Sequence, residues 1–113
     1  GEVQREVDNT DEAIRAYRKA IAANPRYGKP YKYLGVQLLA TKKYNDALSI
    51  LLTASGIISN DPGIYLTLGR VYEEIKKYKM AVRAYGQARR LAARNSRTYK
   101  DAVKALSHAK RQR

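Results

Sequence analysis

Apolar residues recur along most of the chain at the three- and four-residue intervals that are typical of amphipathic helices. Asn24-Pro25 and Asn60-Asp61-Pro62 interrupt this pattern, because proline cannot continue a helix. The pattern predicts helices at about residues 10–23, 28–41, 44–58, 62–75, 78–93 and 96–111. We therefore expect an all-α chain whose helices bury their apolar faces against one another.

An internal repeat is visible at a constant offset of 34 along the sequence. Tyr31-Lys32-Tyr33-Leu34-Gly35 recurs as Tyr65-Leu66-Thr67-Leu68-Gly69, and Lys42-Lys43-Tyr44 recurs as Lys76-Lys77-Tyr78. Glycine and alanine at fixed places let two helices approach closely, while tyrosine and leucine fill the space between layers. One helix pair cannot bury its apolar face alone, so neighbouring pairs must stack.

This pattern resembles the tetratricopeptide repeat, in which an aromatic-x-x-Leu-Gly-x-x-Tyr helix precedes an Ala-x-x-x-aromatic-x-x-Ala helix. The last full unit matches at Tyr65, Leu68, Gly69, Tyr72, Ala81, Tyr85 and Ala88. The middle unit matches at Tyr31, Leu34, Gly35, Ala47 and Ala54, and the first supplies only a second helix, with Ala13, Tyr17, Ala20 and Pro25. The resemblance implies a right-handed α-α superhelix of stacked antiparallel helix pairs.

The repeat divides the chain into five segments. Residues 1–7 are expected to form a frayed N-terminal segment or one cut from a longer chain, and residues 8–27 the second helix of an incomplete repeat. Two full repeats follow at 28–61 and 62–95, and residues 96–113 form a C-terminal capping helix with a basic tail. The capping helix carries Tyr99, Ala102, Val103 and Leu106 at core positions and charge on its other face.

In this family the first helices of successive repeats line a concave groove that binds a peptide, a helix or a partner subunit. Carrying those positions over gives the candidate partner-binding residues Lys29, Lys32, Val36, Leu39, Leu66, Arg70, Glu73, Arg97, Lys100 and Lys104. The groove would be mainly basic and would attract acidic side chains or a terminal carboxylate. The resemblance thus implies a protein-interaction module, an adaptor or scaffold.

A subset of the family holds the carboxylate of chaperone tails with a Lys/Asn/Asn/Lys/Arg clamp. Lys32 matches its first lysine, and Arg97 is a basic substitute for the second. Val36, Thr67 and Asp101 stand at the other three positions, so this clamp is not predicted.

The net charge of +13 is concentrated at one end of the chain. Residues 1–75 hold 10 basic and 9 acidic side chains, whereas residues 76–113 hold 13 basic side chains and one acid, Asp101. An alternative interpretation is therefore electrostatic binding of nucleic acid or of an anionic membrane surface through residues 76–113.

Catalytic and metal-binding patterns are not found. There is no cysteine and a single histidine, His108, so we expect no metal site and no cofactor. No Gly-x-Ser-x-Gly turn and no glycine-rich phosphate loop is present, and the chain is not expected to be an enzyme. No apolar stretch of about 18 residues and no export leader occurs. Because the chain begins with Gly1, targeting signals can be missing, and the compartment stays open with the cytoplasm preferred.

The aromatic residues are ten tyrosines. Six fall on packing positions, Tyr17, Tyr31, Tyr65, Tyr72, Tyr85 and Tyr99, whereas Tyr27 and Tyr33 are expected to be exposed. Two apolar residues, Ile50 and Leu52, fall toward the convex side and are candidates for a contact patch, with a scattered pair of exposed residues as the alternative. We expect weak self-association through this patch or through the incomplete N-terminal repeat.

Overall fold

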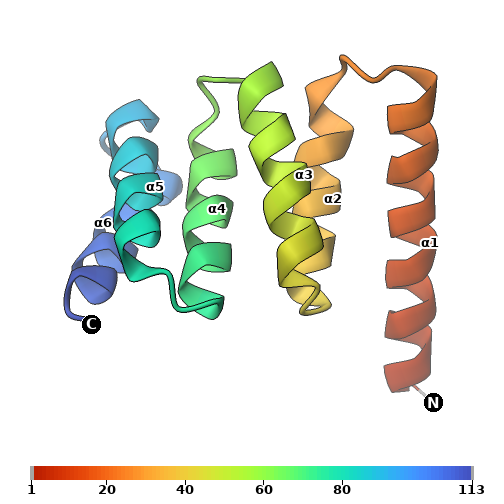
Figure 1. Cartoon of the computed structure of the whole chain (residues 1–113), viewed down its shortest axis with the longest axis horizontal. Coiled ribbons are helices and arrows are strands. Elements are labelled where there is room, and N and C mark those ends of the chain that lie inside the picture. The colour runs from red at the N-terminus through yellow and green to blue at the C-terminus, as the bar shows by residue number, and fades with distance from the viewer. Residues whose placement is uncertain (1, 113) are drawn as a thin grey trace. The chain divides into compact units, whose positions relative to one another are not determined.

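A computed structural model describes the backbone of residues 2–112 and the side chains of residues 9–112. Within these residues the chain forms α-helices and no strand (Figure 1). The helices are α1 (Glu2–Ala23), α2 (Gly28–Ala40), α3 (Tyr44–Ile57), α4 (Pro62–Glu74), α5 (Tyr78–Leu91) and α6 (Arg97–Lys110). The predicted all-α fold class is confirmed.

Helix α1 begins at Glu2, earlier than the start near residue 10 that the hydrophobic pattern predicts. Residues 2–7, which were expected to lie outside the helix, belong to its backbone. Glutamate, glutamine and arginine favour helix there, and neither glycine nor proline interrupts the sequence before Asn24-Pro25. The rest of that expectation concerns Gly1 and the side chains of residues 2–8, which lie outside the described part of the chain.

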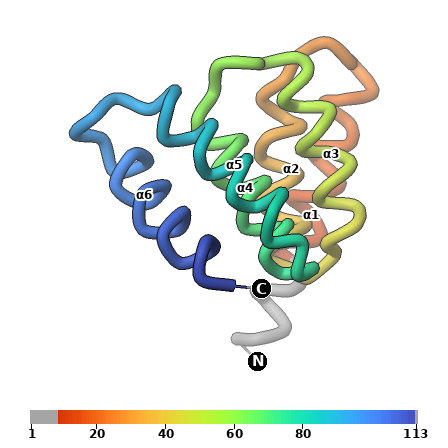
Figure 2. Tube along the Cα trace, turned by 60° about the vertical axis from the view of Figure 1, so that its left-hand side comes forward, coloured from red at the N-terminus to blue at the C-terminus, as the bar shows by residue number. Residues whose placement is uncertain are grey.

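The chain folds into two compact units, residues 1–57 and 58–113. In the first unit α2 contacts both α1 and α3. In the second unit α4, α5 and α6 all contact one another. Figure 2 shows α6 running back beside α5. Each unit therefore contains one complete helix pair and one additional helix.

A glycine allows the two helices of each pair to approach closely. A Cβ atom at Gly69 would overlap the ring of Tyr85 on α5, and one at Gly35 would overlap the side chain of Leu51 on α3. Because no side chain fits at these two positions, the glycines of the repeat are a packing requirement.

The two helix pairs share one turn geometry. Lys42 and Lys76, which occupy equivalent positions of the repeat, both adopt positive φ angles, 64° and 62°. After each of them the next amide donates back into the preceding helix: Lys43 N to Leu38 O at 2.8 Å and Lys77 N to Tyr72 O at 2.8 Å. These bonds satisfy carbonyl groups that the helix end would otherwise leave open.

Tyrosine serves as the large core residue because its hydroxyl finds a partner at the edge of the core. The Tyr31 hydroxyl donates to the Pro25 carbonyl at 2.9 Å, and the Tyr65 hydroxyl donates to the Ser59 carbonyl at 3.2 Å. These two bonds also join equivalent positions of the repeat. Of the six tyrosines expected to pack, Tyr31, Tyr72 and Tyr85 are buried, and the other three are half-buried.

The two additional helices are packed less completely than the pairs. Ala81, Tyr85 and Ala88 on α5 are fully enclosed, whereas their counterparts Ala13, Tyr17 and Ala20 on α1 are half-buried. On α6, Ala102 and Leu106 are buried as expected, but Val103 is 36% exposed, so its expected core position is wrong. It occupies the place of Gly35 and Gly69, and no helix within residues 2–112 follows α6 to cover it.

Candidate binding face of the second unit

Cationic side chains from α4 and α6 form a candidate binding surface in the second unit. We call it the α4–α6 face and define it by Arg70 and Glu73 on α4 and by Arg97, Lys100, Lys104 and His108 on α6. The α6 residues are spaced by three, four and four positions, which places them on one side of that helix. All four arginines and lysines are exposed, and Glu73 is half-buried.

A contact between His108 and Glu73 joins the two helices at one end of this face. His108 Nε2 lies 3.9 Å from Glu73 Oε2. The same Glu73 carboxylate accepts a hydrogen bond from the Tyr85 hydroxyl on α5. Burial of its ring, together with that bond and the charge of Glu73, raises the pKa of Tyr85 well above its ordinary value. Glu73 is thus half-buried and bound to a core tyrosine. The exposed part of the α4–α6 face therefore carries mainly positive charge.

One expected member of this surface is wrong. Leu66 is 7% exposed and belongs to the core together with Ile64 and Leu68, so it is not available to a partner. Its neighbour Thr67 is buried as well, and its hydroxyl donates to the Gly63 carbonyl at 2.8 Å. The side chains of Leu66 and Thr67 in the middle of α4 are therefore buried. The exposed part of the α4–α6 face consists of the α6 residues and Arg70.

The candidate residues of the first unit lie along α2. Lys29 and Val36 are exposed there, and Lys32 and Leu39 are half-buried. Sequence reasoning missed a functional candidate on the same helix. Tyr33, 46% exposed, stacks on Tyr17 of α1 with the ring centroids 6.0 Å apart. Tyr33 stands one repeat before Thr67, which occupies a position of the carboxylate clamp, and this equivalence is the signal that could have identified it.

The two convex candidates do not form one patch. Leu52 is exposed and Ile50 is half-buried. Two residues apart on a helix, their side chains diverge by about 200° around the axis. This geometry therefore favours the interpretation that Ile50 and Leu52 are a scattered pair of apolar residues rather than a contact patch.

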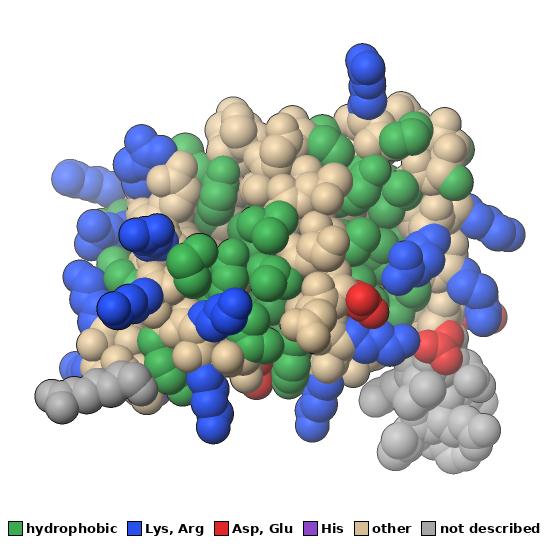
Figure 3. All heavy atoms as spheres, viewed as in Figure 1, with side chains coloured by type: hydrophobic (Ala, Val, Ile, Leu, Met, Phe, Trp, Pro, Cys, Tyr) green, Lys and Arg blue, Asp and Glu red, His purple; other side chains and the backbone are tan. Residues whose placement is uncertain are grey.

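Positive charge dominates the surface of the second unit. In Figure 3 lysine and arginine side chains crowd the surface around α5 and α6. Among residues 9–112 no cluster of three or more acidic or histidine side chains could hold a metal ion. None of the helices that the structure describes is both long enough and apolar enough to cross a membrane.

Comparison with curated proteins identifies relatives among much longer chains. The chain is 30% identical to anaphase-promoting complex subunit 6 of Arabidopsis thaliana. The alignment spans 102 residues, which are 89% of this chain and 19% of that protein. The chain is 31% identical over 75 residues to the O-mannosyl-transferase Tmtc3 of Drosophila melanogaster, covering 66% of this chain and 8% of that protein. The chain therefore spans less than a fifth of the length of these relatives.

Solved structures share the fold. The complex of the TPR2B domain of yeast Sti1 with pHsp70 superposes with a TM-score of 0.87 at 18% identity, covering 100% of this chain and 92% of that one. The first TPR of Spaghetti (RPAP3), bound to the HSP90 peptide SRMEEVD, gives a TM-score of 0.84 at 21% identity, covering 97% and 84%. PcrH in complex with the chaperone-binding region of PopD gives 0.82 at 18% identity, covering 97% and 85%.

The model of one family, the tetratricopeptide repeat, matches residues 1–27 and 62–95, more than half of the chain. The matched segments contain the α4–α5 pair and its close contact between Gly69 and Tyr85. With the constant period of the sequence and the helix pairs of the fold, this match shows that the chain belongs to the tetratricopeptide repeat family.

Proposed function

We propose that the chain is a protein-interaction module and that its α4–α6 face binds an acidic peptide segment. The observation that carries this proposal is the row of exposed cations on α6, Arg97, Lys100 and Lys104, together with the exposed Arg70 on α4, a helix that contacts α6. Hydrogen bonds between such groups and carboxylates are stronger than neutral ones. Structures that share this fold include the Sti1 domain in its pHsp70 complex and the Spaghetti domain bound to an HSP90 peptide. The proposal assigns binding rather than catalysis to this face.

The test compares two variants of equal charge. The chain is first screened on an array of acidic peptides, and the strongest binder is titrated by fluorescence anisotropy. Arg97→Glu with Lys104→Glu changes the α4–α6 face, whereas Arg89→Glu with Arg94→Glu changes exposed positions outside it. We expect the first pair to weaken binding more, because each contact to a charged group contributes about 1.5–3 kcal/mol. Equal losses in both variants would contradict the proposal.

A second candidate function follows from the charge of residues 76–113, which contain 13 basic side chains and one acidic side chain. Such a surface attracts the phosphates of nucleic acid or of an anionic membrane. Binding of this kind depends on total charge and falls steeply as salt rises. A pull-down with and without nuclease at near-physiological salt separates the two functions, because nuclease abolishes only capture that nucleic acid mediates.

A further inference from the structure

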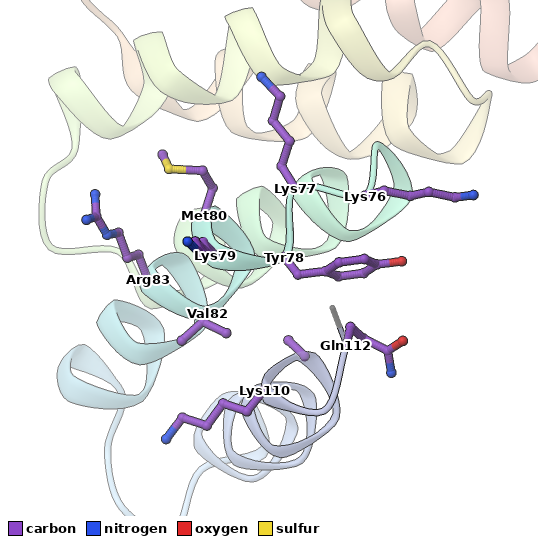
Figure 4. Close-up of a pocket in the computed structure, with 10 residues that line it drawn as sticks. Lys76, Lys77, Tyr78, Lys79, Met80, Val82, Arg83, Lys110 and Gln112 are labelled. Carbon is purple, nitrogen blue, oxygen red and sulfur yellow. The ribbon is translucent and has the colours of Figure 1, made fainter.

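A pocket of about 810 Å³ lies between the start of α5 and the end of α6, and its lining includes none of the residues that define the α4–α6 face. Tyr78, Met80 and Val82 line it from α5, and Ala109 lines it from α6 (Figure 4). Met80 is 38% exposed, which is high for an apolar side chain of this size. The pocket therefore offers aliphatic and aromatic surface to a partner side chain.

Five cations surround this apolar surface. They are Lys76, Lys77, Lys79, Arg83 and Lys110, and the residues that line the pocket include no acid. Figure 4 shows the charged ends of Lys76, Lys77, Arg83 and Lys110 spread in different directions around the pocket. Positive charges around a low-dielectric wall focus the field and raise the local concentration of anionic groups. The pocket suits an acidic segment that also carries aliphatic side chains.

The chain itself contains such a segment. Residues 1–12 hold five acids, Glu2, Glu6, Asp8, Asp11 and Glu12, and one basic residue, Arg5. The same segment contains two aliphatic residues, Val3 and Val7, four positions apart in the sequence. Asp11 and Glu12, whose side chains the structure describes, are exposed. The other five acids are scattered over residues 46–101.

We propose that the acidic segment 1–12 of one copy of this chain docks in the α5–α6 pocket of a second copy. Opposite charge, −4 over residues 1–12 against five cations, brings the two surfaces together. The valines of the segment match the apolar lining of the pocket in chemical character. The contact is head-to-tail and uses different surfaces on the two copies, so it extends into open chains of molecules as concentration rises. It does not depend on the α4–α6 face or on the proposed function.

Three charge variants test the contact by sedimentation velocity at low salt over a wide concentration range. The first reverses the pocket, with Lys79→Glu, Arg83→Glu and Lys110→Glu. The second reverses the segment, with Glu2→Lys, Glu6→Lys and Glu12→Lys. The control reverses three exposed arginines that do not line the pocket, with Arg89→Glu, Arg90→Glu and Arg94→Glu.

We expect the wild type and the control to associate, and each of the first two variants to associate about tenfold or more weakly. A mixture of those two variants should associate again, because each pocket then meets a segment of opposite charge. Circular dichroism shows whether the variants are folded, and the milder set Lys79→Gln, Arg83→Gln and Lys110→Gln replaces any pocket variant that is not.

Four results would overturn the proposal. One is a wild type that stays monomeric at every concentration. The others are association that survives in either variant, a mixture that fails to associate, and a control that weakens as much as the pocket variant. Arg97→Glu with Lys104→Glu should leave self-association in place, so the loss of peptide binding and the loss of self-association are distinguished.

Discussion

At the scale of single residues, the close approach of two helices is decided by one glycine and the large side chain opposite it. Gly69 faces the ring of Tyr85, whose side chain is 1% exposed, and Gly35 faces Leu51 in the same way. Because Tyr85 is enclosed on all sides, its ring cannot move to accept an added methyl group without displacing other core residues.

We predict that Gly69→Ala destabilises the protein by about 1–3 kcal/mol, the usual cost of overpacking a core. Gly86→Ala is the matched control. It lies within α5, where an added Cβ meets no atom within 4 Å, so it should stabilise the helix by about 0.5–1 kcal/mol. Urea denaturation measures both changes. A Gly69→Ala variant as stable as the wild type would contradict the packing described for this helix pair.

A second prediction concerns alkaline pH. The folded state raises the pKa of Tyr85, so the hydroxyl keeps its proton when the unfolded chain has already lost it. Stability is therefore fully present below the unfolded pKa of about 10 and decreases as pH rises above it, by up to about 1.4 kcal/mol per pH unit for this one group. Tyr85→Phe should remove that part of the decrease, as urea midpoints from pH 9 to pH 11 will show.

Tyr31→Phe is the control for this experiment. It removes a partly buried hydroxyl that donates to the Pro25 carbonyl but leaves Tyr85 in place. We expect this variant to be less stable than the wild type and still to lose stability above pH 10, because Tyr85 is unchanged. Equal slopes in Tyr85→Phe and the wild type would show that Tyr85 does not account for the alkaline loss.

At the scale of helices and turns, the two full pairs repeat not only their packing but also their connection. Both turns place a lysine in the left-handed backbone region, at Lys42 and Lys76. Glycine is the usual residue there, because a Cβ makes this conformation unfavourable. The turn is kept by the hydrogen bonds that close the preceding helix, and its local strain is opposed by the docking of the two helices.

Lys42→Gly should therefore stabilise the protein by about 0.5–1 kcal/mol, since it relieves the positive φ angle. Lys43→Gly should destabilise the protein. This position gains no relief of strain, and glycine increases the conformational entropy of the unfolded chain. Thermal unfolding of both variants tests the pair. Destabilisation by Lys42→Gly would mean that the lysine side chain contributes more than its backbone strain costs.

At the scale of the whole molecule, charge is divided unevenly along the sequence. Residues 1–75 are nearly balanced, with 10 basic and 9 acidic side chains, whereas residues 76–113 hold 13 basic side chains and one acid. The excess lies mostly on exposed positions of α5, α6 and the segment between them. Repulsion among these groups opposes the compact state of the second unit, and acidic partners would reduce it.

We predict that added sodium chloride raises the thermal midpoint by a few degrees, because the screening length shortens to about 10 Å at 0.1 M salt. Lys79→Glu with Arg83→Glu lowers the net charge and should show a smaller rise. Calorimetry at several salt concentrations measures this. A midpoint that does not change with salt in the wild type would show that the cations do not repel one another appreciably.

The sequence by itself determined the helix pairs, because the constant repeat period, the glycines and the prolines each constrain the local backbone. It also indicated the exposed stripe of α6, since charged residues three and four apart share one side of a helix. Tertiary structure alone decided that Leu66 is buried, that Val103 is exposed and that Tyr33 stacks on Tyr17. The pocket between α5 and α6 likewise depends on how two helices meet. Helical periodicity specifies which side of a helix a residue occupies, whereas burial depends on which neighbouring helix covers that side.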